Sequence, residues 1–496
     1  MPAATARDSK RKDLGDFQTP PALVAEILDA LERTGGRPGR VLEPTCGRGH
    51  FLAGLLGRPD PPREAFGCEI QPEHAEAARS IATADHPTRL VVRVADAFAV
   101  DFAREPAWES DGPLLVVGNL PWVTTAALGA SGGTNGPGRS NVKNLRGLAA
   151  RTGEANFDIA ESLWLKLVRE LEQERPTIAL LCKSAVARLV LGAIHRADLP
   201  ITRATLWRVD ARRWFRASVD ACLLRVEVGP GPKATEAAVF ADLADPAPAS
   251  ILGLGAGPMV ADLAAYRRFA FADGQSPLTW RQGVKHDAAA VMELTTLDDA
   301  RLANKSGEIV DVEPVHVFPL MKGSDLGGLA VDRPARAVLV TQRRLGEETR
   351  GLERTAPRLW AYLSGHADVF DRRKSSIYRG RPPFCLFGIG DYTFAPWKVA
   401  VSGLHKTPRF VAIGPVEGRP TLFDDTCYFL PCLDRDQAEV LAATLNSPAS
   451  LGLLRSLIFE GAKRPVTKAL LQRLDLKALL AESGRGHLWR DEWATP

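Results

Sequence analysis

The sequence lacks the features that would place it in a membrane or outside the cell. No run of about 18 apolar residues is present to form a membrane-spanning helix. The amino-terminal stretch MPAATARDSKRKDLGDF has no apolar core of the kind found in signal peptides. The seven cysteines are scattered and contain no CxxC pair, which argues against a disulfide framework and against a zinc site. We therefore expect a cytoplasmic protein with reduced cysteines, no bound metal and no membrane partner.

The sequence also lacks a strong charge and a phosphate-binding loop. A net charge of +4 permits a polyanionic partner without requiring one. The motif GxxxxGK followed by Ser or Thr is missing, which argues against a nucleoside triphosphate as ligand. At 496 residues the chain is longer than one hydrophobic core usually holds, so we expect two domains.

Short β-rich runs alternate with amphipathic helical stretches over about the first 230 residues. One of the helices is marked by Ile159, Leu163 and Leu167, which recur on a single face. The alternation predicts an α/β fold with a doubly wound, mostly parallel, Rossmann-like sheet of seven strands. The expected strands are residues 40–44, 65–70, 89–96, 114–119, 177–183, 201–210 and 220–228.

A stretch rich in Gly, Pro and Ala follows the last of these strands. We interpret residues 1–230 as the first domain and residues 231–258 as a linker region. Residues 259–496 show no regular βαβ alternation, and we expect them to form a second domain of mixed α+β structure.

Polar side chains end four of the predicted strands: Glu43, Glu69, Asp96 and Asn119. Because ligands of such sheets bind beyond the carboxyl ends of the strands, we expect these residues around one crevice. In the segment VLEPTCGRGHFL, Gly47 and Gly49 let a ligand approach the backbone just ahead of a helix amino terminus. A plain tight turn, and a capping or solvated role for each acid, are the alternatives.

The spacing of the acids points to a nucleoside. Glu69 ends the second strand, where an acid typically bonds a ribose diol. Asp96 ends the third strand and suits an adenine amino group, with Phe98 as an apolar ring contact. No phosphate-binding lysine accompanies them.

These motifs resemble those of class I S-adenosylmethionine-dependent methyltransferases, and within them the gamma class of N6-adenine DNA methyltransferases. The matching segments are FQTP (17–20), LEPTCGRGHFL (42–52), NLPW (119–122) and NFDIAESLW (156–164), with Glu69 and Asp96 between them. In the carboxyl half, RQGVKHDAAAVMEL, PLMKGSDL, RRKSSIYRGRPPF and DDTCYFLPCL resemble the target-recognition domains of type II and IIG restriction-modification methyltransferases. The resemblance implies S-adenosyl-L-methionine as cofactor and double-stranded DNA as substrate.

The resemblance also implies a set of cofactor contacts. They are Thr19, Pro20, Glu43, Pro44, Cys46, Gly47, Gly49, Phe51, Glu69, Ile70, Asp96, Ala97, Phe98, Asn119 and Asp158. For Asp158 the alternative is a cap on the helix that follows it.

The tetrapeptide Asn119, Leu120, Pro121, Trp122 matches the family's catalytic motif. The resemblance implies that the Asn119 side-chain oxygen and the Leu120 carbonyl accept the two hydrogens of the adenine amino group. It also implies that Trp122 stacks on a base flipped out of the duplex, with Phe215, or alternatively Trp214, on the opposite face of that base. A core tryptophan beside a turn is the alternative for Trp122.

The tetrapeptide departs from the family's Asn-Pro-Pro-aromatic pattern at Leu120. Since the first Pro acts through its main-chain carbonyl, Leu supplies the same acceptor but loses the fixed φ of proline. Adenine dimethylases of ribosomal RNA resemble Asn-Leu-Pro-aromatic at this point, so an RNA substrate stays open as an alternative.

Basic residues gather in the second domain within DRRKSSIYRGRPPF. We predict DNA contacts there through Arg372, Arg373, Lys374, Ser375, Tyr378, Arg379 and Arg381. Further DNA contacts are predicted at Lys285 and Lys322, and, from the acid-free segment 124–153 of the first domain, at Arg139, Lys143 and Arg146. A solvated charged face and a disordered surface loop are the respective alternatives.

We therefore predict a site-specific adenine-N6 DNA methyltransferase, the modification component of a restriction-modification or phage-defence system. The Thr-Pro motif begins within 20 residues of the amino terminus, so any endonuclease or other defence subunit is expected on a separate polypeptide. The alternatives are an RNA adenine-N6 methyltransferase and a DNA-binding subunit without catalytic activity.

Overall fold

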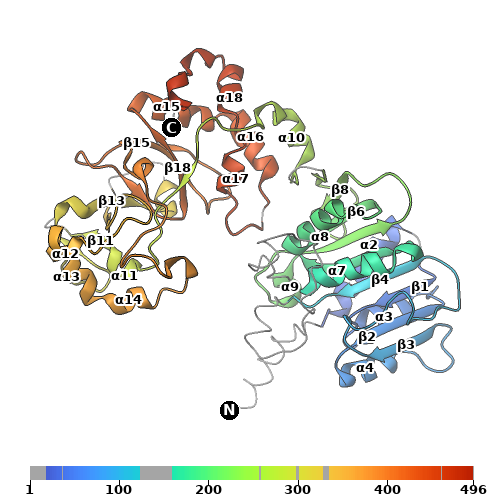
Figure 1. The fold of residues 1–496 in the computed structure, drawn as a ribbon. Coiled ribbons are helices and arrows are strands. Elements are labelled where there is room, and N and C mark those ends of the chain that lie inside the picture. Colours follow the sequence, from blue (N-terminus) through green and yellow to red (C-terminus); the bar gives the residue numbers. More distant parts are fainter. Residues whose placement is uncertain are drawn as a thin grey trace. The chain divides into compact units, whose positions relative to one another are not determined.

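The computed structural model describes residues 18–35, 37–122, 159–255, 259–297, 301–327, 334–459 and 461–494. The chain divides into two compact units, Met1–Leu263 and Ala264–Pro496 (Figure 1). All seven cysteines are buried and none forms a disulfide. Within the described ranges, no helix combines the length and the apolar character needed to cross a membrane.

The first unit is built on a nine-stranded sheet with the strand order β3-β2-β1-β4-β5-β7-β6-β8-β9. The first five strands pair in parallel, and β7 runs antiparallel to both of its neighbours. This confirms the predicted α/β class and the mostly parallel sheet. The seven predicted strands are β1 (Arg40–Glu43), β2 (Glu64–Glu69), β3 (Arg89–Val94), β4 (Leu114–Asn119), β5 (Thr177–Lys183), β6 (Ile201–Val209) and β7 (Ala221–Val228).

The expected linker 231–258 contributes two further strands to this sheet. β8 (Glu236–Phe240) pairs in parallel with β6, and β9 (Ser250–Gly253) pairs antiparallel with β8. Ala237 and Val239 are buried and alternate with more exposed neighbours, which is the period of a strand with one buried face. Alanine content made this stretch look like a linker, whereas the division between the units lies between Leu263 and Ala264.

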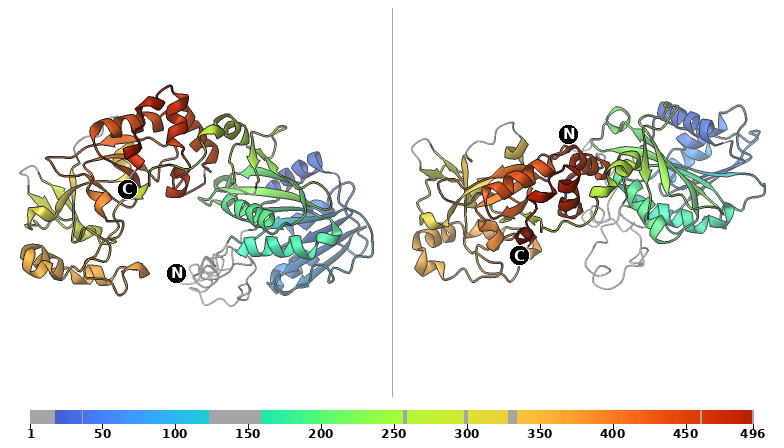
Figure 2. Two further views of the ribbon diagram at one scale, coloured as in Figure 1. Left: turned by 45° about the horizontal axis from the view of Figure 1, so that its top comes forward. Right: turned by 90° about the horizontal axis from the view of Figure 1, so that it is seen from above.

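Helices cover both faces of the sheet. In Figure 2 the blue helix α2 (Pro21–Thr34) and the teal helix α7 (Ile159–Glu170) lie on opposite sides of it. The other helices within the described residues of this unit are α3 (His50–Leu56), α4 (Pro72–Arg79), α8 (Ser184–Arg196) and α9 (Ala211–Phe215). The predicted helix around Ile159 is confirmed as α7, whose apolar residues are buried.

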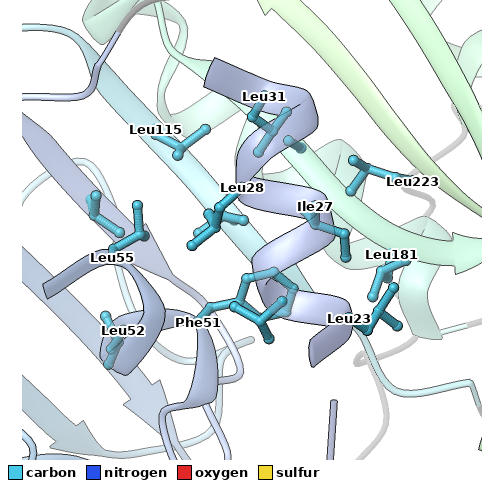
Figure 3. Close-up of a cluster of buried hydrophobic side chains, with 14 of the residues drawn as sticks. Leu23, Ile27, Leu28, Leu31, Phe51, Leu52, Leu55, Leu115, Leu181 and Leu223 are labelled. Carbon is cyan, nitrogen blue, oxygen red and sulfur yellow. The ribbon is translucent and has the colours of Figure 1, made fainter. Parts of the chain in front are cut away.

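Helix α2 starts where Pro21 occupies the first helical position, since proline's fixed φ suits that turn and its missing N–H is not needed there. Its side chains Leu23, Ile27 and Leu31 recur at helical spacing and are buried. Figure 3 shows them against Phe51 of α3 and Leu115, Leu181 and Leu223 of the strands. A change such as Ile27→Ala costs about 2–5 kcal/mol of stability by leaving a cavity.

The second unit has the mixed α+β structure that was predicted. A four-stranded sheet has the order β10-β18-β15-β16 and a five-stranded sheet the order β12-β11-β14-β13-β17. Their strands are β10 (Arg281–Gln282), β11 (Glu293–Thr296), β12 (Leu302–Ala303), β13 (Val317–Met321), β14 (Arg336–Leu339), β15 (Trp397–Ser402), β16 (Val411–Ile413), β17 (Leu422–Phe423) and β18 (Cys427–Cys432). The helices of this part of the chain are α10 (Leu263–Phe269), α11 (Ala289–Met292), α12 (Leu352–Thr355), α13 (Pro357–Gly365), α14 (Ala367–Asp371), α15 (Arg435–Leu445), α16 (Pro448–Leu457), α17 (Lys468–Leu471) and α18 (Leu476–Glu482).

Candidate functional site

The turn between β1 and α3 requires glycine at two positions. Gly47 and Gly49 have φ values of 52° and 80°, a region that other residues rarely adopt. A Cβ at Gly47 would lie 2.7 Å from Oε1 of Gln18, and one at Gly49 would lie 3.0 Å from Cβ of Ala78. The backbone of this turn is therefore closely packed and conformationally fixed ahead of α3.

Glu69, at the end of β2, is tied to this turn. Its Oε2 accepts the Gly47 N–H at 2.9 Å, and its Oε1 accepts the Gln71 N–H at 2.8 Å. The predicted acid of strand two and the predicted glycine turn are thus brought together by a direct hydrogen bond. Each carboxylate oxygen has a second lone pair, so the Glu69 carboxylate retains acceptor capacity for a ligand hydroxyl.

Glu43, at the end of β1, is an acid whose burial opposes its ionisation. Its side chain is buried, and its Oε2 has no hydrogen-bond partner among the residues that the structure describes. Burial raises its pKa well above the ordinary value; a hydrogen bond from the Leu52 amide opposes that rise, and the charge of Glu69 adds to it. A buried carboxylate with an unpaired oxygen is satisfied by a cation placed against it.

The segment that precedes α2 is hydrogen-bonded to the glycine turn between β1 and α3. Oε1 of Gln18 accepts the Arg48 N–H at 3.1 Å, and Nδ1 of His50 lies 2.7 Å from the Thr19 carbonyl oxygen. Thr19 is buried, and Pro20 is the residue that precedes the first turn of α2. The predicted Thr-Pro motif therefore lies beside the glycine turn.

Asp96 caps the backbone of its own turn, which is the role expected from the sequence as the alternative to ligand binding. Its Oδ1 accepts the Phe98 N–H at 2.9 Å, which closes a tight turn after β3. Ala97 is buried, Phe98 packs against Ile159, and Ile70 is exposed at the end of β2. This turn uses only Oδ1, and the Asp96 side chain is partly exposed, so Oδ2 can accept a hydrogen bond from a ligand.

Phe51, Pro44 and Cys46, which are also expected cofactor contacts, are buried in the packing of the site. The Phe51 ring is 1% exposed in the core cluster of α2 and α3, so it presents no surface to a ligand (Figure 3). Pro44 and Cys46 are also buried, and burial together with the charges of Glu43 and Glu69 raises the pKa of the Cys46 thiol. The structure therefore gives Phe51 a packing role in place of the expected contact.

The tetrapeptide follows β4 and lies beside the β1 turn. Thr45 Oγ1 donates to the Asn119 carbonyl at 3.3 Å, and a Cβ at Gly118 would lie 3.3 Å from Cγ of Glu43. Asn119 and Glu43 thus end neighbouring strands with their backbones linked through Thr45. Leu120 is buried, and its N–H, which a proline would lack, donates to the Leu181 carbonyl at 3.4 Å.

The rings of Trp122 and Phe215 lie together, but they contact each other and do not face each other across a space for a base. Their ring centroids are 5.1 Å apart with planes at 66°, an edge-to-face contact. Phe215 ends α9, and Trp214 beside it is covered by the Arg213 guanidinium at 4.3 Å. The predicted placement of Phe215 on the opposite face of a base does not hold in this conformation, because the rings touch each other.

Several of the predicted DNA-binding residues in the second unit form hydrogen bonds or ion pairs with other residues of that unit. The Arg373 guanidinium donates to the Cys385 carbonyl at 3.0 Å and lies 3.8 Å over the ring of Tyr378, which is buried. These two residues stabilise the loop rather than present groups to a ligand. Arg372 forms an ion pair with Asp368, one turn earlier on the chain.

Lys285 and Lys322 are also paired within the unit. Lys285 Nζ lies 3.1 Å from Asp287, and Lys322 Nζ lies against Glu293. The remaining members of the basic cluster are Lys374, Ser375, Arg379 and Arg381, which are exposed or partly exposed. The predicted residues Arg139, Lys143, Arg146 and Asp158 lie outside the described residues.

Comparison with known proteins identifies the family. No family model matches the sequence. The chain is 36% identical over 476 residues to the type II methyltransferase M.NspV of Nostoc sp., an alignment that covers 95% of this chain and 98% of that protein. This chain belongs to the type II methyltransferases. The predicted relationship to restriction-modification methyltransferases is therefore confirmed.

The solved structure of the type IIL restriction-modification enzyme MmeI in complex with DNA is similar to this type II methyltransferase in fold. The TM-score is 0.54 with 12% sequence identity, and the match covers 96% of this chain and 77% of that chain. The match covers both units, which agrees with a sheet-containing α/β unit followed by a further domain.

S-adenosyl-L-methionine is the cofactor of this type II methyltransferase, as predicted. The residues present fit it, because the compound carries an ammonium and a sulfonium charge and buried Glu43 offers an Oε2 that has no hydrogen-bond partner among the described residues. Sequence reasoning missed Gln18, Thr45 and His50, which hold the glycine turn, the tetrapeptide and the Thr-Pro motif together. Only their proximity to motif residues in the sequence could have pointed to them.

Proposed function

We propose that this methyltransferase modifies the N6 amino group of an adenine within a specific site of double-stranded DNA. The observation that carries the proposal is the position of Asn119. It ends β4 next to Glu43, and its carbonyl is held by Thr45 at 3.3 Å. An amide at this point lies next to the carboxylate and the glycine turn that fit the cofactor.

The chemistry needs acceptors more than it needs a base. The lone pair of an adenine amino group is delocalised into the ring, so the nitrogen is a weak nucleophile. The bound cofactor supplies an electrophilic methyl group on a sulfonium. Asn119 Oδ1 and the Leu120 carbonyl accept hydrogen bonds from the two N6 hydrogens, which favours a tetrahedral nitrogen with its lone pair directed outward. The protein therefore contributes positioning and electrostatic stabilisation.

The cofactor is held by the residues that converge on the β1 turn. Glu43 carries the charge that complements the cationic end, and Glu69 accepts from the ribose hydroxyls. Asp96 accepts from the adenine amino group through its partly exposed carboxylate. Gly47 and Gly49 keep the backbone close to the ligand.

Access to N6 requires the target adenine to leave the duplex. Trp122 supplies an aromatic face on which the extruded base stacks, a contact worth about 1–3 kcal/mol. Because Trp122 and Phe215 touch edge to face, the base and Phe215 both contact the Trp122 ring. Lys374, Arg379 and Arg381 of the second unit contact the DNA backbone.

The biological role we propose is modification of host DNA in a restriction-modification or phage-defence system, with cleavage carried out by a separate endonuclease. The basis is family membership with M.NspV.

One experiment separates this proposal from the two alternatives. The protein is incubated with S-adenosylmethionine labelled in its methyl group and with duplex DNA, single-stranded DNA or RNA, and the products are digested to nucleosides. Label in N6-methyladenine from duplex DNA is expected. Label from RNA alone indicates an RNA methyltransferase, and cofactor binding without transfer to any substrate indicates an inactive DNA-binding subunit.

A further inference from the structure

Loops from distant parts of the sequence meet where β15 ends and β18 begins, in the second unit (Figure 1). The Gly403 N–H donates to the Thr426 carbonyl at 2.8 Å, and the Gly403 carbonyl accepts the Val466 N–H at 3.4 Å. The Gly323 N–H donates to Thr426 Oγ1 at 2.9 Å. Segments 403–410, 424–426 and 461–468 therefore lie side by side at this end of the four-stranded sheet.

Two of these segments carry positive charge without any acidic residue. Their sequences are GLHKTPRF (403–410) and GAKRPVTK (461–468). Together they supply Lys406, Arg409, Lys463, Arg464 and Lys468.

The charges at this end of the sheet are only partly compensated. Arg464 pairs with Asp425 at 3.3 Å, and Lys285 lies 3.1 Å from Asp287. Lys322 pairs with Glu293. Lys285 and Lys322, two of the lysines that the sequence pattern suggested for DNA contact, are thus neutralised. Three exposed lysines have no ion pair with any residue that the structure describes: Lys406, Lys463 and Lys468.

Buried residues hold both lysine-bearing loops in place. Phe410 is buried and exchanges two hydrogen bonds with the Asn446 side chain, at 3.0 and 2.7 Å. Val466 is fully buried, and a Cβ at Gly403 would lie 3.0 Å from the Thr426 carbonyl oxygen, which leaves no room for a side chain there. Because the loops are already ordered, less conformational entropy is lost when a ligand binds their exposed lysines.

We propose that Lys406, Lys463 and Lys468 form a second contact surface for the phosphate backbone of duplex DNA, additional to the 372–381 cluster. The surface is made of uncompensated positive charge on ordered loops, which suits phosphates and carries no sequence information. The inference rests on the proposed function, because DNA is the polyanion that a site-specific DNA methyltransferase binds. It assigns Lys406, Lys463 and Lys468 to affinity and register, not to base readout.

The test uses the full chain in which all three lysines are changed to alanine, with a matched triple arginine variant. Binding to a mixed-sequence duplex is measured by fluorescence anisotropy over a series of salt concentrations. We expect the alanine variant to bind more weakly, and the slope of log affinity against log salt to fall by about 1 for each lysine that contacts a phosphate. The arginine variant keeps the wild-type slope. Lys305→Ala, which removes an exposed lysine from the turn after β12, is the control and leaves the slope unchanged.

Failure of this inference is distinguishable from failure of the proposed function. If the wild-type protein methylates duplex DNA but the triple alanine variant binds with unchanged affinity and slope, this surface is not a DNA contact and the proposed function stands. If the wild-type protein neither binds nor methylates duplex DNA, both are overturned. Thermal melting of the variants checks that the loops remain folded.

Discussion

The rings of Trp122 and Phe215 meet edge to face, with centroids 5.1 Å apart. This contact links the end of the tetrapeptide to helix α9 in the absence of a base. In the proposed reaction Trp122 also receives the extruded adenine, so the base and Phe215 both contact this ring.

Trp122→Ala therefore removes the stacking surface. We expect KM for duplex DNA to rise by about 5- to 150-fold, corresponding to the roughly 1–3 kcal/mol of base stacking, while cofactor affinity stays unchanged. Trp122→Phe retains an aromatic face and most of the affinity. Near-normal kinetics of Trp122→Ala in steady-state transfer assays would remove the stacking role.

Glu43→Gln is expected to improve stability and impair cofactor binding together. Burial raises the pKa of Glu43 in the folded state above its unfolded value of about 4.3. The folded state thus binds this proton more tightly, and stability falls as the pH rises above about 4.3 toward the raised folded pKa. At neutral pH the neutral Gln avoids this loss, and the melting temperature of the cofactor-free protein rises.

The same substitution removes the charge that complements the cofactor. Loss of a hydrogen bond to a charged group costs about 1.5–3 kcal/mol, so we expect affinity for S-adenosylmethionine to fall by about 10- to 100-fold. Melting curves with and without cofactor measure both effects. A variant that melts lower than wild type yet binds the cofactor normally contradicts this account of Glu43.

We expect Lys398 to make the stability of the second unit dependent on pH. Its side chain is buried in β15, and its Nζ donates to the carbonyls of Ala395 at 2.7 Å and Thr421 at 2.9 Å. Burial lowers its pKa to about 7, against about 10.4 in the unfolded chain. Between those two values the unfolded state binds more protons, so the free energy of unfolding rises with pH by up to about 1.4 kcal/mol per pH unit.

Denaturant unfolding at several pH values between about 7 and 10 checks this. Lys398→Met should lose the slope that this residue contributes, whereas Lys305→Met, at an exposed position, should keep it. Equal slopes in wild type and Lys398→Met would show that the buried amine is not the origin.

Leu120→Pro installs the proline of the Asn-Pro-Pro-aromatic pattern that the tetrapeptide resembles, and it tests the role proposed for the Leu120 carbonyl. The variant loses the hydrogen bond from the Leu120 N–H to the Leu181 carbonyl, which costs about 0.5–1.5 kcal/mol of stability. Since the carbonyl acceptor is retained, we expect kcat within about tenfold of wild type. Complete loss of transfer in a folded variant would show that this chain needs leucine for a reason beyond its carbonyl.

The strand tips could be predicted because each lies where an apolar run stops. Glu43, Glu69 and Asn119 end β-rich segments, and parallel pairing brings such ends to one edge of a sheet. Strands β8 and β9 were missed because their Ala, Gly and Pro content is also typical of a linker. In the structure Ala237 and Val239 are buried and alternate with more exposed neighbours, but the strand sequence EAAVF has four apolar residues in a row and does not show that alternation.

Charge contacts could not be predicted from the sequence in the same way. Arg373 and Lys322 were both predicted to contact DNA, yet the fold places carbonyls around the first and Glu293 beside the second. Such pairings join residues far apart in the chain, and no local pattern encodes them. The edge contact between Trp122 and Phe215 is of the same kind.

The most direct test of the central claim is methyl transfer by the wild-type protein and by Asn119→Ala, measured side by side on duplex DNA with identification of the labelled nucleoside. The account predicts N6-methyladenine from the wild type, a loss of about 100-fold or more in the variant from removal of one preorganised acceptor, and largely intact cofactor binding. Undiminished transfer by Asn119→Ala, or label in any other nucleoside, would contradict it.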